Sequence, residues 1–255
     1  MSLISHSNAD AVKENFIFPE WPAPANIRSI ITTRKGGVSK DHFESFNIAQ
    51  HVEDNVRAVE NNRTILRRLL PNEPTWLRQV HGNKVIHANL DTPQNMEADA
   101  AVTKTPGVVL AIQTADCLPV LFSDRKGTIV GACHAGWRGL CNGVVEHTMV
   151  EMQCSPQDII VYLGPAIGPK KFEVGAEVRE AFIGKHTKTA SAFVQISDDK
   201  WLADIYSLAR IRLSIAGVTE IYGGNFCTFS DHERFYSYRR HKQTGRMASL
   251  IWLTS

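Results

Sequence analysis

The stretch GVVLAIQTADCLPVLFSDRKGTIVGACHAGW, residues 107–137, decides the fold of this chain. It contains two long runs of mainly apolar, often β-branched residues, and the polar residues SDRKG (123–127) separate them. Runs of this composition predict β-strands, and a short polar turn between two strands predicts antiparallel neighbours. After Gly139 the apolar spacing becomes helical, so we expect a strand pair followed by a helix.

Strands and helices are mixed without strict alternation on both sides of this stretch. β-type patterns occur at 27–33, 75–90, 158–169, 220–229 and 247–253, and helical patterns at 54–70, 140–152, 174–184 and 202–217. In the first of these helices we place the N-cap at Asp54 and the buried face at Val56, Val59, Leu66 and Leu69. The mixture predicts an α+β fold with mixed sheets. Without a repeat or a linker, we expect one domain over 1–255, with an irregular N-terminal segment at 1–25.

The composition excludes several classes of protein. Hydrophobic residues make up 43% of the 255 residues and charged residues 21%, which is typical of a packed globular chain. The formal net charge of +2 gives no reason to expect nucleic acid or an anionic membrane as a partner. The N-terminus lacks a signal-peptide pattern, and the five cysteines are an odd number, so we expect reduced thiols and a cytoplasmic location. Oligomeric state is not encoded in any pattern that we recognise.

Three residues with metal-binding side chains stand in similar places. His81, Cys117 and His134 each lie where an apolar strand pattern gives way to a turn. Strand ends are where side chains from separate elements converge on one edge of a sheet, and imidazole and thiolate are good zinc ligands. Three protein ligands leave a fourth position open, as catalytic zinc sites require. We therefore predict a metal site, with the alternative that these are packing cysteine and hydrogen-bonded core histidines.

The alternation of side chains along a strand distinguishes Cys133 from the candidate metal ligands. Cys133 and His134 are adjacent, so in an extended strand they point to opposite faces. If His134 faces the metal, Cys133 faces the packing layer. We predict that Cys133 is a core residue and not a ligand.

Several longer strings carry a resemblance to a known family. These strings are ITTRKGGVS (31–39), FNIAQHVEDN (46–55), QVHG (79–82), TADCLPVLF (114–122), HAGWRG (134–139), LGPAIGP (163–169), SYRR (237–240) and TGRMASLIW (244–252). Their identity and order resemble the YfiH/laccase-domain family from about residue 28 to the C-terminus.

The resemblance implies a layered α/β sandwich with mixed β-sheets, and one zinc held by His81, Cys117 and His134. It implies phosphorolysis of adenosine, guanosine, inosine and methylthioadenosine, together with deamination of adenosine. The implied partners are purine nucleosides and phosphate. Older descriptions of the family as polyphenol oxidases imply copper as the alternative metal.

Further residues are candidates for the chemistry. Arg34 and Lys35 precede two glycines whose backbone N–H groups could approach phosphate, with an ordinary turn as the alternative. Arg138 precedes a predicted helix and could bind phosphate there, or pair with a carboxylate. Asn47 could contact the nucleoside or cap a turn. Asp116 could transfer a proton or support the metal site.

We nominate Cys117, Asp116 and Arg34 as catalytic residues, and Arg34, Lys35, Asn47 and Arg138 as substrate or phosphate ligands. The HxE and PCxxC signature of zinc base deaminases is absent, so the general acid and base of deamination are not identified.

Other functions compete with the nucleoside enzyme. A copper polyphenol oxidase could use the same His-Cys-His set, but the closely spaced histidine pairs of a multicopper site are absent. A cysteine hydrolase acting on cell-wall precursors could use Cys117 as nucleophile with a histidine base. A non-catalytic zinc-binding module would keep the metal without turnover.

Overall fold

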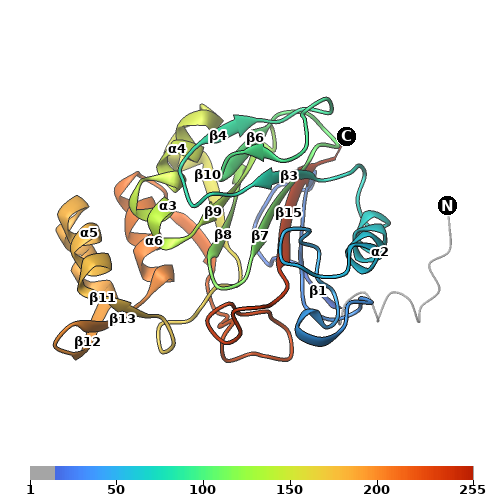
Figure 1. The fold of residues 1–255 in the computed structure, drawn as a ribbon. Helices are drawn as coiled ribbons and strands as arrows, with labels where there is room; N and C mark the ends of the chain where they lie inside the picture. The colour runs from blue at the N-terminus through green and yellow to red at the C-terminus, as the bar shows by residue number, and fades with distance from the viewer. Residues whose placement is uncertain (1–14, 255) are drawn as a thin grey trace.

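The fold, seen in a computed structural model that describes residues 15–254, is built on two six-stranded mixed sheets and a small third sheet (Figure 1). In spatial order, the first sheet contains β1 (Phe16–Ile17), β2 (Ile27–Thr32), β15 (Met247–Leu253), β7 (Val109–Thr114), β3 (Thr75–Arg78) and β5 (Met96–Glu97). Its first four strands are antiparallel neighbours, whereas β3 runs parallel to both β7 and β5.

The second six-stranded sheet carries the strands of the central sequence stretch. In spatial order it contains β14 (Glu220–Gly223), β10 (Ile159–Leu163), β8 (Leu118–Asp124), β9 (Val130–Ala135), β6 (Ala100–Thr103) and β4 (Val85–His87). The two edge pairs are parallel and the others antiparallel. The small antiparallel sheet contains β11 (Glu173–Gly175), β13 (Lys200–Ala203) and β12 (Phe193–Ser197).

The outer faces of the two large sheets are covered by α2 (Val56–Arg67), α3 (Trp137–Cys141), α4 (Val144–Met152) and α6 (Ile205–Ile215), whereas α5 (Ala176–Lys185) packs against the small sheet. The short 3-10 helices are η1 (Asp41–Phe43), η2 (Pro156–Asp158) and η3 (Thr187–Ala192). Figure 1 shows α2 on one side of the strands and α3, α4 and α6 on the other.

The hydrophobic clusters show how the layers pack. One cluster joins residues of both large sheets, such as Ile112 and Ile251 of the first and Leu121 and Ala132 of the second, and therefore lies between them. A second cluster packs the other face of the first sheet against α2, and a third packs the other face of the second sheet against α3, α4 and α6. The layers thus follow the order helix, sheet, sheet, helix, which confirms the expected layered sandwich with mixed sheets.

The third of these clusters continues into the small sheet through Val174, Phe193 and Ala203. A shared core supports the prediction of one domain over 1–255, which stays a prediction. The predicted irregular segment 1–25 needs a correction, because Phe16 and Ile17 pair with β2. Residues 1–14 of that segment lie outside the described residues.

The central stretch is confirmed in part. β8 and β9 are antiparallel neighbours across the predicted turn. The first apolar run, however, is not one strand, because β7 and β8 belong to different sheets. The chain crosses between them at 115–117, where Asp116 has φ 91°. Apolar periodicity cannot reveal such a crossing, since strands buried on both faces read as a continuous apolar run.

Two details of the first helix were predicted wrongly. Asn55, and not Asp54, caps α2, because its side chain accepts a hydrogen bond from the Ala58 amide. The Asp54 carboxylate instead accepts hydrogen bonds from Ser39 and Asn47. Val56 is 63% exposed and does not belong to the buried face. Tertiary hydrogen bonds to Asp54 outweigh the local capping preference that the sequence suggested.

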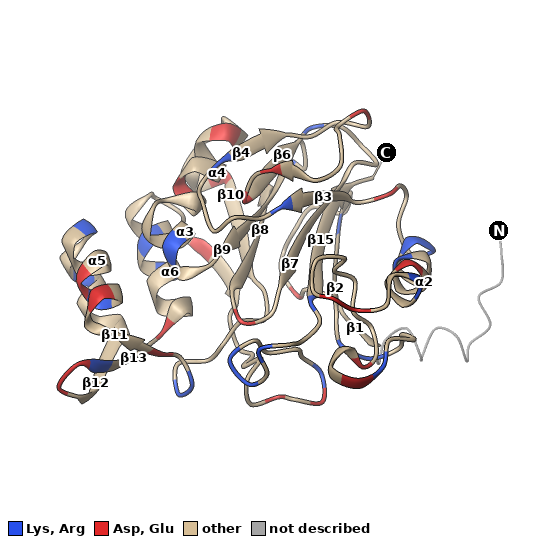
Figure 2. Ribbon diagram, viewed as in Figure 1, with Lys and Arg blue, Asp and Glu red and all other residues tan. Residues whose placement is uncertain are grey.

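The helix predicted after Gly139 begins at Trp137 and is interrupted at Gly143, whose φ is 89°. Charged side chains lie mainly on helices and loops, and the central strands carry few of them (Figure 2). In the part of the chain that the structure describes, no helix has the length and apolar character needed to span a membrane.

Candidate metal centre

The structure brings the three predicted metal ligands together. The ligand atoms of His81, Cys117 and His134 all lie within 4.8 Å of one another. The Cys117 Sγ lies 3.7 Å from the His81 Nε2, and the two imidazole rings meet nearly edge to face with centroids 4.7 Å apart. His134 is buried, Cys117 is half-buried and His81 is exposed, so the group is open on one side.

Strand pairing explains why residues so far apart in sequence meet. Cys117 directly precedes β8, whose first residues pair with the end of β9, where Pro119 faces His134. His81 follows β3, which runs parallel to β7, so that the carboxyl ends of these two strands lie at the same edge. The three side chains therefore converge where both sheets end.

Asp99 organises the site, and sequence reasoning missed it. Its buried carboxylate lies 2.8 Å from the His134 Nδ1 and accepts hydrogen bonds from the backbone amides of Val80, His81 and Gly82 at 2.7–3.1 Å. The bond to His134 requires a proton on Nδ1, which leaves Nε2 free as a metal ligand. One carboxylate thus orients one of the candidate histidine ligands and holds the turn that carries the other.

A signal for Asp99 was present in the sequence. It is a lone acidic residue in the otherwise apolar run ADAAV, residues 98–102, directly before β6. A charged residue in such a run is almost never fully buried unless it is paired. That pattern predicts a buried polar partner, although it cannot say which one.

The backbone around the site is tightly constrained. His81 has φ 62°, in the left-handed region that non-glycine residues rarely adopt, and its amide is held by Asp99. Gly136 is required for close packing, because a Cβ there would come within 2.7 Å of the His81 ring and 3.1 Å of the Cys117 Sγ. Left-handed residues and close backbone approach concentrate at functional sites.

Electrostatics favour the ionised form of Cys117. Burial by itself raises the pKa of the thiol, but the charges and hydrogen bonds of His134 and His81 lower it to about 6. Burial lowers the pKa of His134, but the Cys117 thiolate and Asp99 raise it to about 9. Without a metal, these two shifts favour the thiolate and imidazolium forms of the pair. A metal that binds thiolate and neutral imidazole would displace the His134 proton.

This charge state gives a testable prediction for metal-free protein. The thiolate is the reactive form, and it forms as pH rises through about 6, so iodoacetamide should modify Cys117 with a midpoint near that pH. Mass spectrometry of chelator-treated protein measures the rate at each pH. Cys133 is the internal control, because burial raises its pKa and it should stay unmodified. A midpoint near 9 for Cys117 would show that the histidines do not stabilise the thiolate.

The prediction that Cys133 is a core residue is confirmed. Its side chain is fully buried among the residues between the second sheet and α4. His134, the next residue along β9, is the one that joins the metal group. Strand alternation alone therefore distinguished the two.

The proposed proton-transfer residue Asp116 is held firmly in place. Its carboxylate accepts hydrogen bonds from Thr228 (2.6 Å), Ser237 (3.0 Å) and the Arg239 amide (2.6 Å). These bonds tie the turn that carries Cys117 to the segment before β15. They support the structural alternative for Asp116, and proton transfer by this residue stays a prediction.

Two of the candidate residues on the N-terminal side, Arg34 and Asn47, are occupied by contacts within the protein. The Arg34 guanidinium donates hydrogen bonds to the carbonyls of Glu44 and His232 and lies 5.1 Å from the Tyr236 ring. Lys35 is exposed. The buried Asn47 side chain donates two hydrogen bonds and accepts two, so it has no group left for a nucleoside. The turn-capping alternative fits Asn47 better.

Arg138 lies on the side of the metal centre formed by α3. It is exposed, and its guanidinium stacks on the Trp137 ring at 4.5 Å. Because α3 begins two residues after β9, both side chains lie close along the chain to His134. Phosphate binding by Arg138 stays a prediction.

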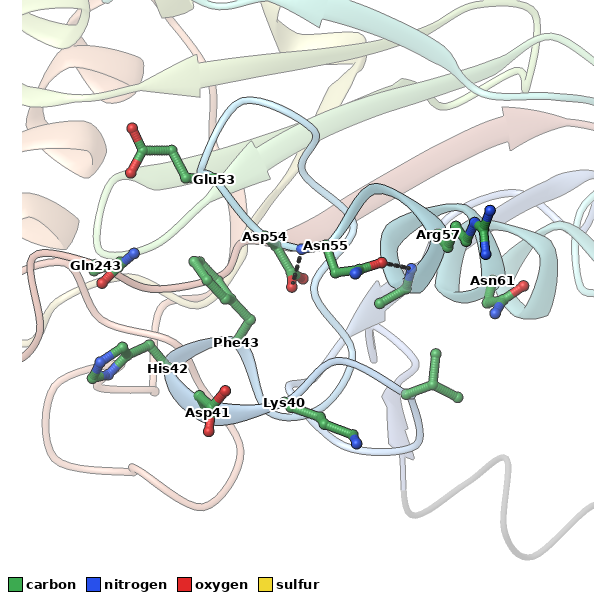
Figure 3. Close-up of a pocket in the computed structure, with 12 residues that line it drawn as sticks. Lys40, Asp41, His42, Phe43, Glu53, Asp54, Asn55, Arg57, Asn61 and Gln243 are labelled. Atoms are coloured by element: carbon green, nitrogen blue, oxygen red, sulfur yellow. Dashed lines mark hydrogen bonds between the residues drawn. The ribbon is translucent and has the colours of Figure 1, made fainter.

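A separate cavity of about 640 Å³ lies at the start of α2 (Figure 3). Its lining includes Lys40, Phe43, Asp54, Arg57 and Gln243, and none of the three metal ligands. The side chain of Asp54 borders this cavity and also bonds to Asn47.

Comparison with known proteins places the chain in a family. Residues 28–254 match the family model described as multi-copper polyphenol oxidoreductase laccase. The chain is 54% identical to the purine nucleoside phosphorylase PA4543 of Pseudomonas aeruginosa over 239 residues, which are 93% of this chain and 98% of that protein. It is 52% identical to the purine nucleoside phosphorylase YfiH of Escherichia coli strain K12, with the same coverage.

Solved structures agree with these relationships. The crystal structure of the Neisseria meningitidis protein NMB0706 has a TM-score of 0.92 and 48% identity, covering 94% of this chain and all of that one. YlmD of Geobacillus stearothermophilus has a TM-score of 0.84 and 29% identity, covering 94% of this chain and 99% of that one. With sequence, site geometry and fold in agreement, the chain belongs to the YfiH/laccase-domain family.

Proposed function

We propose that this protein is a zinc-dependent purine nucleoside phosphorylase that also deaminates adenosine. The observation that carries the proposal is the group of His81, Cys117 and His134 within 4.8 Å, oriented by a buried Asp99. The names of the relatives from Pseudomonas aeruginosa and Escherichia coli support the nucleoside chemistry. We extend the substrates to adenosine, guanosine, inosine and methylthioadenosine, and place the protein in the cytoplasm, in keeping with its five free cysteines.

The donor set fits zinc. Two imidazole nitrogens and one thiolate are zinc ligands of ordinary type, and the exposed side of the group leaves room for a further ligand. Zinc bound there would supply Lewis acidity and lower the pKa of bound water to about 7. The protein itself contributes orientation, because Asp99 binds the His134 ring and the His81 amide. Gly136, which has no side chain, allows the backbone at the start of α3 to pack against His81 and Cys117.

Phosphorolysis and deamination differ in their second substrate. In phosphorolysis a phosphate oxygen forms a bond to C1′, the bond from C1′ to the base nitrogen breaks, and the base leaves with a proton. In deamination, water replaces the C6 amino group and ammonia leaves. Both need a site that positions the purine and balances negative charge. We propose that arginine side chains near the metal centre, such as Arg138, balance this negative charge. Asp116 remains the candidate for proton transfer.

One observation favours a second candidate, a cysteine hydrolase. A thiolate with a pKa of about 6 beside two histidines is the arrangement of a catalytic cysteine nucleophile. Asp99, however, accepts hydrogen bonds from both His134 and the His81 amide. This arrangement also suits a metal site, because it fixes the positions of two candidate metal ligands. Activity that survives complete removal of the metal would favour the hydrolase.

We expect adenosine to react by two separable routes, which incubation of metal-analysed protein with adenosine can resolve. With phosphate, chromatography should show adenine and ribose 1-phosphate. Without phosphate that route should stop, while inosine still forms, because water is the only second substrate of deamination. Chelation should stop both routes, and added zinc should restore them. If metal-replete protein yields neither adenine nor inosine, the proposed function is wrong.

A further inference from the structure

Two half-buried arginines near the metal centre have no carboxylate partner. Arg63 on α2 donates from Nε to the Ile48 carbonyl (2.9 Å), and its guanidinium lies 4.3 Å from the Trp76 ring. Arg246 donates from Nη1 to the carbonyls of Thr244 (2.8 Å) and Gly245 (3.0 Å). Within residues 15–254, neither forms an ion pair within 4.0 Å. Their other N–H groups have no described partner and are not buried.

The segment 47–51 joins these two arginines. The Arg246 amide donates to the Asn47 Oδ1 (3.0 Å), Arg63 binds the next residue, Ile48, and His51 follows. Burial lowers the pKa of His51, and the charges of Arg246 and Arg63 lower it further. Two arginines thus contact one short segment, and a histidine lies at its end.

Nearby carboxylates are committed to other partners. Asp54 accepts hydrogen bonds from Ser39, Asn47 and the Asn55 amide. Glu73 accepts the Trp76 Nε1–H at 2.9 Å. Because like charges held together repel, two guanidinium groups that form no ion pair favour the binding of an anion.

Strand pairing places this cluster next to the metal ligands. Arg246 precedes Met247, the first residue of β15, which pairs with Thr114 at the end of β7. Cys117 lies three residues after Thr114, in the link between β7 and β8. The negative charge of Cys117 acts to raise the pKa of Arg246, against the lowering by burial. An anion held by Arg246 would therefore lie beside the metal centre.

A side chain with an unpaired polar atom lies on the face of the first sheet that packs against α2. Gln113 is 6% exposed, and its buried Oε1 has no hydrogen-bond partner among the described residues. Gln113 alternates with Val109 and Ala111, which pack against Trp76 and α2, the helix that carries Arg63. Phosphate at neutral pH retains a P–O–H group, which an amide oxygen can accept while arginines bind the other oxygens.

We propose that Arg63 and Arg246, together with His51, bind the phosphate co-substrate beside the metal centre. This assignment rests on the proposed phosphorolysis. It differs from the sequence-based one, because the Arg34 guanidinium already binds two backbone carbonyls and Arg138 lies on the side of α3. Guanidinium groups bind phosphate through charge-assisted, often bidentate hydrogen bonds.

Calorimetric titration of the zinc-loaded protein with inorganic phosphate tests the assignment without nucleoside. Arg63→Gln and Arg246→Gln should each weaken phosphate binding about tenfold or more, equivalent to about 1.4 kcal/mol per factor of ten. Arg246→Lys should retain part of the affinity, because the charge remains. Arg57→Gln is the matched control, an exposed arginine of the same helix, and should bind phosphate as the unaltered protein does. Zinc content and melting temperature verify that each variant is folded and loaded.

The outcomes separate this proposal from the proposed function. Phosphate affinity that is unchanged in both glutamine variants, or equally weakened in Arg57→Gln, would overturn the phosphate site even if adenosine is cleaved. Absence of phosphate binding to the unaltered protein would overturn it as well. Arginine-dependent phosphate binding without any nucleoside cleavage would support the site and refute the phosphorolysis.

Discussion

Cys117→Ala should lower bound zinc from close to one per chain to a small fraction and should abolish turnover of adenosine. The thiolate is one of only three protein ligands in the group, and the histidines already stabilise its ionised form. Removing it leaves His81 and His134 alone, and two imidazoles bind zinc far more weakly than the complete set. Elemental analysis of purified protein, with chromatography of adenosine products, measures both effects.

Cys133→Ala is the matched control for this variant. The two cysteines are both close to His134, but Cys133 faces the core and takes no part in the metal group. Its replacement should cost about 1 kcal/mol or more of stability through the small cavity that it leaves. Zinc content should remain near one per chain. Equal zinc in unaltered protein and Cys117→Ala would refute the ligand assignment.

Asp99→Asn should have the second largest effect, a fall in zinc affinity of about 10–100-fold, as expected when the partner of a ligating histidine is changed. The carboxylate binds the His134 ring and the amides of Val80, His81 and Gly82. An amide has a single acceptor oxygen and introduces two N–H donors, so at least one of these donors loses its partner. Each unsatisfied buried donor costs about 1–3 kcal/mol, so stability should fall as well.

A second buried aspartate separates the effect on the metal from the effect on folding. Asp124 accepts hydrogen bonds from the Thr128 amide and hydroxyl and from the Ile129 amide, in the turn between β8 and β9 at the opposite end of these strands. Asp124→Asn should destabilise the protein comparably without a change in zinc affinity. Competition with a chromogenic chelator measures the affinity, and urea unfolding measures stability. If Asp99→Asn binds zinc as tightly as Asp124→Asn, Asp99 does not organise the metal centre.

Local patterns predicted much of the secondary structure. The turn at 123–127, the antiparallel pair that flanks it and the helix that ends before Gly217 all depend on neighbouring residues, and all are present. The predictions failed where distant groups compete with local ones. Asp54 has the side chain of an N-cap, but Ser39 and Asn47 bind it, and Asn55 caps the helix instead.

The candidate metal ligands could be nominated from sequence because each has a side chain able to bind a metal and lies at a strand end, and because alternation excluded Cys133. Asp99, Arg63 and Arg246 could not be assigned in this way. A carboxylate or a guanidinium acquires its role from the groups that surround it, and these come from the turn after β3, from β9 and from the segment 47–51.

By itself, the sequence determined the class of fold, the family strings and the chemical identity of the candidate metal ligands, because these depend on residue type and on short-range spacing. Only the tertiary structure decided that the apolar run at 108–122 belongs to two sheets, that Asp99 holds both histidines, and that Arg63 and Arg246 contact the segment 47–51 without forming an ion pair among residues 15–254. Burial, the pairing of charges and the direction of a side chain are set by contacts between segments distant in sequence. No local pattern can specify those contacts before the sheets have assembled.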